Sequence, residues 1–385
     1  MKILQVIPSL AAAHGGPSRA LGIIESALRK HGIVVETATT DDHGPGQVNG
    51  RPTGVPLNED GATRWYFRKR LDFYKVAPGL GRWVGQHARD YDLVHIHALF
   101  SYTSAAAAGA CRRSGVPYVI RPLGTLSSYG VARRRPWLKR LSLACVEGPL
   151  LRDAAAVHFT SGAEQREAEA LGIPMRGVVI PLAVEPPEAG DPTLLRARFG
   201  ISAERRILLY LSRLDPKKNL EGLLRGFALC RDRLADVCLA VAGAGPPDYS
   251  ASLQALAGDL GLGEHIVWTG HLDGAMKASG LAAAQAFILP SFSENFGIAA
   301  AEALAAGLPC VLGNGVALAE EVAESGAGIS VEPEPGAIAA GMVRVMADDA
   351  VRQAMAGRAS ALAADRYSVA AMGRNLKRLY ERILG

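Results

Sequence analysis

Two glutamates stand eight residues apart in the alanine-rich stretch SFSENFGIAAAEALAAGLPCV, residues 291–311. The stretch suits a buried helix, and carboxylates are rarely buried unless another group pairs with them. Glu294 falls in the loop before the expected helix, and Glu302 lies more than one turn inside it. Carboxylates accept hydrogen bonds from hydroxyl groups, so this pair is suited to binding polyols. The alternative interpretation is that Glu294 is only a charge near the helix cap and that Glu302 is a surface residue.

The loop before this helix also favours a phosphate. AFILPS is expected to be a strand, and the helix is expected to begin around Asn295–Gly297, with Phe296 between them and Ile298 following. The first amides of a helix lack partners and carry partial positive charge. Gly297 allows the backbone to approach a ligand closely.

A second candidate loop, in YLSRLDPKKNLEGLL, holds Arg213 and Lys218. Arginine supplies a bidentate fork and lysine a point charge, a combination suited to a diphosphate. The alternative is a solvated basic loop. Asn219 is expected to cap the next helix in either case.

A third candidate loop, SLAAAHGGPSRA, places Gly15 and Gly16 directly before a helix. All three loops follow expected strands, and open α/β sheets bind ligands outside the carboxyl ends of their strands. Asp90-Tyr91-Asp92 resembles a D-x-D metal site but precedes its strand. His95 and His97 are interpreted as core or site-lining histidines rather than a metal pair, and His97 is expected near substrate.

The elements around these loops alternate between strands and helices, which predicts parallel sheets covered on both faces. We expect a first domain over 1–183, a proline- and charge-rich linker over 184–200, and a second domain over 201–365. An amphipathic helix over 366–385 is expected to cross back to the first domain. The two domains are expected to face a shared cleft.

Composition indicates an ordinary globular protein, with 49% hydrophobic and 21% charged residues among 385. Five scattered cysteines favour reduced, mostly buried thiols, and the expected location is cytoplasmic. Residues 1–180 carry 23 Lys and Arg against 14 Asp and Glu, whereas the remainder carries 19 against 23. The first half is therefore expected to meet an anionic partner.

Two basic tracts contain aromatic residues, RWYFRKR at 64–70 and RRRPWLKR at 133–140. They suit the surface of an anionic membrane, where the protein would be peripheral. A solvated face with buried aromatics is the alternative. Nucleic acid is not an expected partner, because no binding module accompanies the tracts.

SENFGIAAAEALAAGLPCV resembles the E-x7-E signature of retaining GT-B glycosyltransferases of family 4. SRLDPKKN and GGPSRA resemble that family's diphosphate-binding and glycine loops, and the resemblance covers essentially the whole chain. It implies that Glu294 holds the donor hexose and Glu302 the ribose. It also implies that Arg213 and Lys218 neutralise the leaving diphosphate, with help from the amides of Gly297 and Ile298 and from Gly16. The expected partners are a nucleotide sugar and a glycan or polyprenyl-diphosphate-linked acceptor, without a metal or other cofactor.

One loop departs from the family pattern. Many relatives carry a histidine after the fourth strand, next to the donor sugar, whereas VIRPLGTLSSYG has Leu123 or Gly124 there, with Arg121 nearby. We therefore expect His97, Arg121 and Gly124 near the sugar or acceptor. A nucleotide-sugar epimerase and a non-catalytic nucleotide-sugar-binding protein are the alternative functions.

Overall fold

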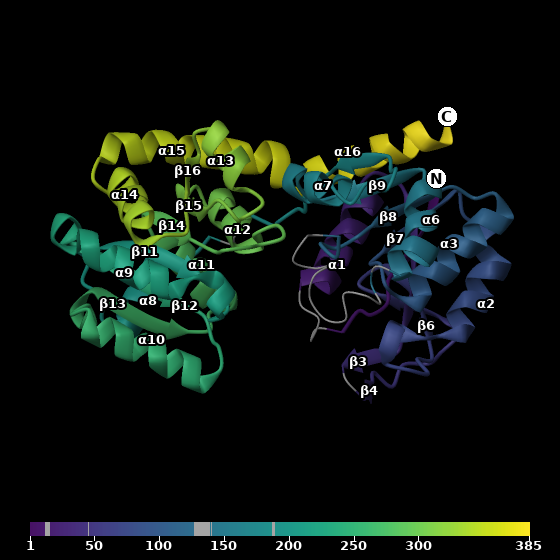
Figure 1. The fold of residues 1–385 in the computed structure, drawn as a ribbon, viewed down its shortest axis with the longest axis horizontal. Coiled ribbons are helices and arrows are strands. Elements are labelled where there is room, and N and C mark those ends of the chain that lie inside the picture. Colours follow the sequence, from purple (N-terminus) through teal and green to yellow (C-terminus); the bar gives the residue numbers. More distant parts are fainter. Residues whose placement is uncertain (12–15, 45, 127–138, 140, 187–188) are drawn as a thin grey trace. The chain divides into compact units, whose positions relative to one another are not determined.

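The computed structural model describes residues 1–385 except 12–15, 45, 127–138, 140 and 187–188 (Figure 1). The chain divides into two compact units, Met1–Ala183 with Val369–Gly385, and Val184–Ser368. Each unit is built on its own mostly parallel sheet flanked by helices. The predicted α/β class, with two doubly wound Rossmann-like domains, is confirmed.

The first unit contains an eight-stranded sheet, parallel except where β5 meets β6. The order reverses between β1 and β7, the kind of position where open α/β sheets bind ligands. A separate hairpin pairs β3 (Asp42–Gly44) with β4 (Gln47–Val48). In spatial order the strands are β10 (Gly177–Val179), β9 (Ala156–Phe159), β8 (Tyr118–Arg121), β7 (Leu93–His97), β1 (Lys2–Val6), β2 (Val34–Thr40), β6 (Ala62–Phe67) and β5 (Pro56–Glu59).

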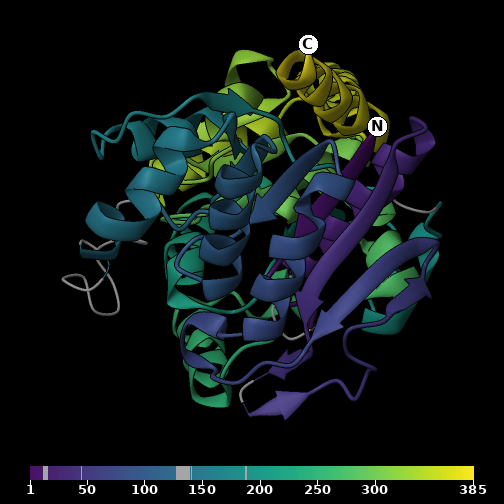
Figure 2. The same ribbon diagram turned by 90° about the vertical axis from the view of Figure 1, so that its right-hand side faces the viewer.

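Helices cover both faces of this sheet. One face buries Leu4, Val6 and Ile96 against α2 and α3, which lie over the strands as blue helices in Figure 2. The other buries Ile3 and Leu93 against α1 and α16, so the C-terminal helix packs on the unit that contains the N-terminus. The helices are α1 (Gly16–Lys30), α2 (Pro78–His87), α3 (Tyr102–Ser114), α6 (Gly148–Asp153), α7 (Gly162–Glu169) and α16 (Val369–Leu384).

The second unit contains a six-stranded, fully parallel sheet whose order reverses between β11 and β14. In spatial order its strands are β13 (Ile266–Gly270), β12 (Val237–Ala242), β11 (Arg206–Leu211), β14 (Ala286–Leu289), β15 (Cys310–Gly313) and β16 (Gly328–Val331). Its helices are α8 (Pro192–Phe199), α9 (Leu220–Cys230), α10 (Pro247–Asp259), α11 (Gly274–Ala283), α12 (Ile298–Ala305), α13 (Ala319–Glu324), α14 (Pro335–Met346) and α15 (Asp349–Leu362).

Part of the expected linker over 184–200 is helical, because Pro192–Phe199 form α8, and the second compact unit begins at Val184. Asp191 caps that helix by accepting from the Thr193 amide, and Leu195 is buried. The Leu195 amide donates to the Ser279 hydroxyl on α11 at 2.9 Å. Proline and charge therefore mark a helix start here rather than a free connection.

The basic tract over 64–70 is largely built into the first unit. Arg64 pairs with buried Glu25, and Tyr66 and Phe67 are core residues of β6. Lys69 pairs with buried Asp42. The alternative of buried aromatics therefore holds for this tract. The second tract, 133–140, lies outside the described residues except for Lys139.

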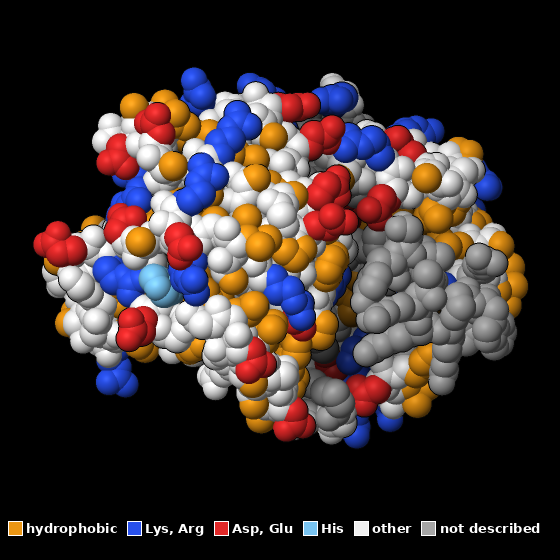
Figure 3. All heavy atoms as spheres, turned by 60° about the vertical axis from the view of Figure 1, so that its left-hand side comes forward, with side chains coloured by type: hydrophobic (Ala, Val, Ile, Leu, Met, Phe, Trp, Pro, Cys, Tyr) orange, Lys and Arg blue, Asp and Glu red, His pale blue; other side chains and the backbone are white. Residues whose placement is uncertain are grey.

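The cysteines are mostly buried and unpaired, as predicted: four of the five free cysteines are buried, and Cys145 is exposed. Among the described residues, no helix has both the length and the apolarity needed to cross a bilayer. On the face shown in Figure 3, basic and acidic side chains are interspersed.

Candidate functional site

The loops after β11 and β14 bring together two of the predicted site residues. Lys218 Nζ contacts a carboxylate oxygen of Glu294 as an ion pair, although 76 residues separate them in the chain. The side chain of Lys218 is 9% exposed and that of Glu294 is 24% exposed. The pair therefore lies at the carboxyl ends of the two strands between which the sheet order reverses.

Local hydrogen bonds hold Lys218 in place. Asp215 accepts from the Lys217 amide and begins a short 3-10 turn over Pro216–Lys218. Asn219 then adopts a left-handed φ of 57° and caps α9 by accepting from the Gly222 amide, as predicted. Its side-chain nitrogen donates to the Pro290 and Pro333 carbonyls at 3.2 and 2.8 Å. One asparagine thus ties the lysine loop to the start of the glutamate loop.

The backbone around Glu294 is held equally firmly. The Phe292 amide donates to the Lys217 carbonyl at 3.0 Å, and the Glu294 amide donates to the Gly315 carbonyl at 2.9 Å. A Cβ at Gly315 would lie 2.1 Å from the Phe292 carbonyl oxygen. Only glycine therefore allows the loop after β15 to approach so closely, a constraint that the sequence analysis missed.

Helix α12 begins with amides that no side chain caps. Its N-cap residue is Gly297, in a left-handed conformation with φ of 91°. The amides of the first turn, beginning at Ile298, are suited to an anion. The Phe296 ring is buried edge-on against Tyr367, so this residue can offer only its backbone to a ligand. Asn295 is exposed.

Glu302 is a buried ion-pair partner rather than the surface residue of the alternative interpretation. It is 8% exposed, and its Oε1 lies 2.7 Å from Lys277 Nζ on α11. A carboxylate buried this deeply requires such a partner. Lys277 is not predicted from the sequence: its helix is expected, but no local pattern distinguishes its side chain.

Arg213 is exposed, and the structure does not pair it with Lys218 or Glu294. Its backbone carbonyl accepts from the Tyr210 hydroxyl at 3.3 Å. The neighbouring glycines in VAGAGPP have a packing role, because a Cβ at Gly243 would lie 1.8 Å from the Ser212 carbonyl oxygen. The loops after β11 and β12 therefore approach each other closely.

The residues predicted near the sugar or acceptor lie in the first unit. His97 and Arg121 end β7 and β8 as register partners, and both are buried. Gly124 adopts a φ of 72° in the loop after β8. Gly16 is the first residue of α1, and Gly15 lies outside the described residues.

The histidines of β7 form a core hydrogen-bond network. His95 Nδ1 lies 2.8 Å from the Tyr380 hydroxyl on α16, and its Nε2 lies 3.4 Å from His158 Nδ1. His97 Nε2 donates to the Gln5 side-chain oxygen at 2.6 Å. Burial lowers the pKa of both His95 and His97 well below its usual value. Within the described part of the chain, no group of three or more acidic, histidine or cysteine side chains is placed to hold a metal ion.

Two buried glutamates support the loops next to this network, and the sequence analysis missed both. Glu164 accepts from the Gly124 amide and from the amide and hydroxyl of Thr160, each at 2.7 Å. Glu147 accepts from the Phe100 amide at 3.1 Å and from the Tyr74 hydroxyl at 2.7 Å. These carboxylates position the loops after β8 and β7, respectively.

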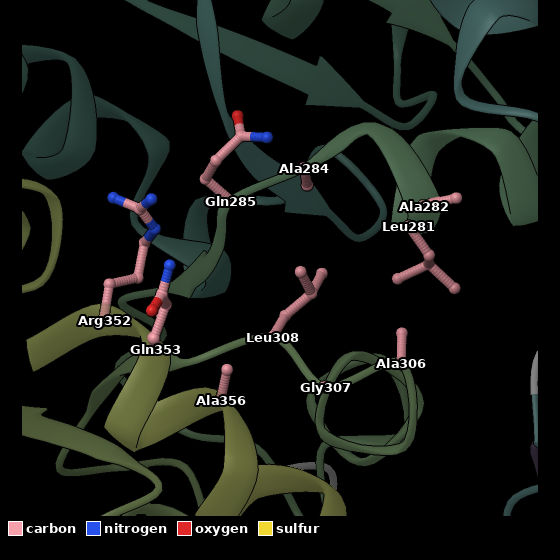
Figure 4. Close-up of a pocket in the computed structure, with 10 residues that line it drawn as sticks. All are labelled: Leu281, Ala282, Ala284, Gln285, Ala306, Gly307, Leu308, Arg352, Gln353 and Ala356. Carbon is pink, nitrogen blue, oxygen red and sulfur yellow. The ribbon is translucent and has the colours of Figure 1, made fainter. Parts of the chain in front are cut away.

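Other sequence patterns lie away from these loops. Asp92 precedes β7 and accepts from the Lys2 amide, so Asp90-Tyr91-Asp92 lies at the amino end of its strand. A cavity of about 280 Å³ in the second unit lies beside Gln285 and Leu308, which precede β14 and β15 (Figure 4). The Gln285 side chain is already bonded to the Ile207 amide and the Ala283 carbonyl. This cavity is therefore at the opposite strand ends from Lys218 and Glu294.

Comparisons with known proteins agree with this architecture. Residues 15–183 match the model of a glycosyl transferase 4-like domain, and residues 192–361 match that of glycosyl transferases group 1. HepE of Anabaena in complex with UDP has a TM-score of 0.78 at 21% identity, covering 99% of this chain and 100% of that one.

Curated relatives include two enzymes of Mycolicibacterium smegmatis. The GDP-mannose-dependent alpha-(1-6)-phosphatidylinositol monomannoside mannosyltransferase is 32% identical over 46% of this chain and 48% of its own length. The phosphatidyl-myo-inositol mannosyltransferase is 32% identical over 58% of this chain and 56% of its own. The chain thus matches about half the length of these relatives. With both domain models matched in order on a GT-B fold, the chain belongs to the family 4 GT-B glycosyltransferases.

Proposed function

We propose that the protein is a retaining hexosyltransferase. It moves a hexose from a UDP- or GDP-sugar to a lipid-linked or cell-surface glycan acceptor, and it needs no metal. The observation that carries the proposal is the contact between Lys218 and Glu294 at the strand-order reversal of the second unit. It combines a cation for a phosphate and a carboxylate for hydroxyl groups at one place.

Each group in this region has a role in the proposal. Lys218 and the exposed Arg213 neutralise the donor diphosphate, together with the amides at Gly297 and Ile298. Glu294 accepts from hydroxyls of the hexose, and Glu302, oriented by Lys277, accepts from the ribose. Because Lys218 is paired with Glu294, donor binding would transfer the lysine from the carboxylate to the phosphate.

Transfer would proceed on one face of the sugar. The bond from the anomeric carbon to the leaving phosphate oxygen breaks as the acceptor oxygen bonds to that carbon on the same side, which retains its configuration. The acceptor proton passes to the departing phosphate oxygen. The principal work of the protein is then to stabilise charge developing on the diphosphate.

Support for the donor class comes from the names of similar proteins. One relative is described as GDP-mannose-dependent, and the structural neighbour HepE was solved with UDP. Both relatives from Mycolicibacterium smegmatis are named for phosphatidylinositol-based acceptors, which favours a lipid-linked acceptor.

A surface loop of the first unit is suited to binding the surface of an anionic membrane. Leu71 and Phe73 are 58% and 67% exposed, and the exposed Arg68 and Arg70 precede them. Apolar side chains beside cations suit the boundary between lipid headgroups and acyl chains. This loop, rather than the whole tract over 64–70, is the proposed contact.

A thermal-shift panel of UDP, GDP, ADP and their sugars tests the donor class, because a ligand that binds only the folded protein raises its melting temperature. We expect one uridine or guanosine series to do so. The matching nucleotide sugar should then give an α-linked product from an α-linked donor, with activity retained in a chelator. Binding without turnover on any lipid-linked acceptor would favour the non-catalytic alternative, and recovery of an isomerised nucleotide sugar would favour an epimerase.

A further inference from the structure

Arg121 belongs to a buried polar cluster on the face of the first sheet that α1 and α16 cover. It is 2% exposed and is the register partner of His97 on the next strand. Gln5 on β1 accepts from His97 Nε2, so three neighbouring strands contribute to the cluster. The Gln5–His97 bond spans β1 and β7, where the strand order of this unit reverses.

No carboxylate among the described residues is in ion-pair contact with Arg121. Burial lowers its pKa to about 10, so the guanidinium stays protonated at neutral pH. Glu164 raises that pKa from a distance, but its oxygens are engaged by Gly124 and Thr160. Burial likewise lowers the pKa of His158 to about 3, which leaves Arg121 as a cation among neutral imidazoles. A buried charge without a partner is strongly unfavourable.

Hydrogen-bonding atoms of the cluster are also without partners. Within the described part of the chain, Arg121 Nε, Gln5 Nε2 and His97 Nδ1 are buried and make no hydrogen bond of normal geometry, although the Gln5 amide lies near enough to the Tyr380 hydroxyl to lower the pKa of that tyrosine. The first two are donors. In the tautomer in which His97 Nε2 donates to Gln5, Nδ1 carries no proton and can accept from a hydroxyl. Two donors with a cation, beside one acceptor, complement an oxyanion that bears or adjoins a hydroxyl group.

The loops beside the cluster adopt costly backbone conformations. Ala98, Phe100 and Leu123 have φ values of 82°, 53° and 59°, a left-handed region that side chains other than glycine rarely occupy. The Ala98 amide donates to the Arg121 carbonyl at 2.9 Å, so one of these residues is bonded directly to the cluster. Such conformations concentrate at binding and catalytic sites.

We propose that Arg121 and Gln5 bind an oxyanion, a phosphate or carboxylate group, carried by the acceptor, with His97 accepting from an adjacent hydroxyl. The evidence for the oxyanion site is the set of unpartnered polar atoms of Arg121, Gln5 and His97, all of which lie in the first unit. The assignment of this site to the acceptor rests on the proposed transferase function, in which Lys218 and Arg213 of the second unit already serve the donor diphosphate.

Inorganic phosphate is the first probe, compared with chloride at equal ionic strength. We expect phosphate to raise the melting temperature of the wild-type protein in a concentration-dependent manner. Arg121→Met should abolish this shift. Without phosphate, the same variant should melt about 2–4 °C or more above the wild type, because an uncompensated buried charge has been removed.

Arg64→Met is the matched control, since Arg64 Nη2 lies 2.7 Å from Glu25, whose side chain is 1% exposed. Without Arg64 the buried Glu25 carboxylate has lost its counter-ion, so the melting temperature should fall. The increase in melting temperature caused by phosphate should persist. A wild-type protein indifferent to phosphate, or an Arg121→Met variant that keeps the shift, would overturn the oxyanion site. So would an Arg121→Met variant that melts lower or does not fold, since Arg121 would then be structural.

A second arm identifies the source of the oxyanion. Phosphate is titrated into protein saturated with the nucleoside diphosphate from the donor panel. We expect the two shifts to add, and Arg121→Met to retain the nucleotide shift. Competition between phosphate and nucleotide would overturn the assignment to the acceptor. Because the first arm involves neither nucleotide nor sugar, its result does not depend on whether the protein transfers a sugar.

Discussion

The two units place their ligand-suited groups at equivalent points of their sheets but balance the charge differently. In the second unit, Lys218 pairs with Glu294 and Lys277 with Glu302, so both lysines have a carboxylate in contact, whereas Arg213 is exposed to solvent. In the first unit, Arg121 is more deeply buried and has none among the described residues. The two lysines of the second unit are therefore neutralised by carboxylates, whereas the buried guanidinium of the first unit is not.

This difference indicates what each half binds. A lysine and carboxylate in contact can separate to bind a diphosphate and sugar hydroxyls together, which suits a nucleotide sugar. A lone buried guanidinium can gain only from an anion. Substitutions in each half of the molecule test this contrast.

Removing a cation from the second unit should have the largest effect. Lys218→Ala or Arg213→Ala should lower turnover by about two orders of magnitude or more, the scale of losing a key electrostatic donor. Steady-state kinetics with the identified donor measures this. Arg225→Ala, on the exposed side of α9, is the control and should keep normal rates. Near-normal turnover in both site variants would reject their proposed role.

The next test displaces the backbone of the loop that carries Glu294. In Gly315→Ala the new Cβ would lie 2.1 Å from the Phe292 carbonyl oxygen, and such overpacking costs about 1–3 kcal/mol. Both unfolding free energy and nucleotide affinity should fall. Gly336→Ala, where a Cβ meets nothing within 4 Å, provides the control and should be neutral or slightly stabilising. If both variants behave alike, the close approach of these loops is not needed.

In the first unit, Glu164→Gln replaces an acceptor of three hydrogen bonds with a group that also donates. We expect a loss of about 1–2 kcal/mol in unfolding free energy, because a buried donor is left unsatisfied. Phosphate protection should weaken as the loop holding Gly124 loosens. Glu169→Gln, exposed on the same helix and bonded to the neighbouring Gln165 side chain on the helix surface, should change stability by no more than about 0.5 kcal/mol. Equal stability in the two variants would argue against a positioning role for Glu164.

The smallest effect is expected at the membrane loop. Arg70→Gln should weaken binding to anionic vesicles about fivefold at low salt, since one cation near such a surface contributes about 1 kcal/mol. Vesicle sedimentation measures the difference, with Arg225→Gln as the control. Absence of wild-type binding at low salt would instead indicate an acceptor in solution.

The fold was predictable because its strands and helices leave strong local patterns. The apolar runs RILLYL and AFIL favour buried strands, and the position of Asn219 favours a helix cap, as the structure has them. The strand β6 is not predicted from the sequence, because Arg64, with Lys69 just after the strand, gives this stretch a basic appearance although buried carboxylates neutralise both. Their partners, Glu25 and Asp42, lie far away in sequence.

The candidate site was predictable only for residues in recognisable loops. Lys218 and Glu294 follow strands and carry motif patterns, so both were found, and the structure places them in contact. Lys277, Glu147 and Glu164 act through tertiary contacts that no local pattern encodes. The isolation of Arg121 is likewise visible only when its surroundings are known.

The most direct measurement is calorimetric titration of the nucleoside diphosphate and of inorganic phosphate into the wild type, Lys218→Ala and Arg121→Met. We predict that Lys218→Ala loses nucleotide affinity and keeps phosphate binding, whereas Arg121→Met keeps nucleotide affinity and loses phosphate binding. Undiminished nucleotide binding by Lys218→Ala would contradict the central assignment of the donor site to the contact between Lys218 and Glu294.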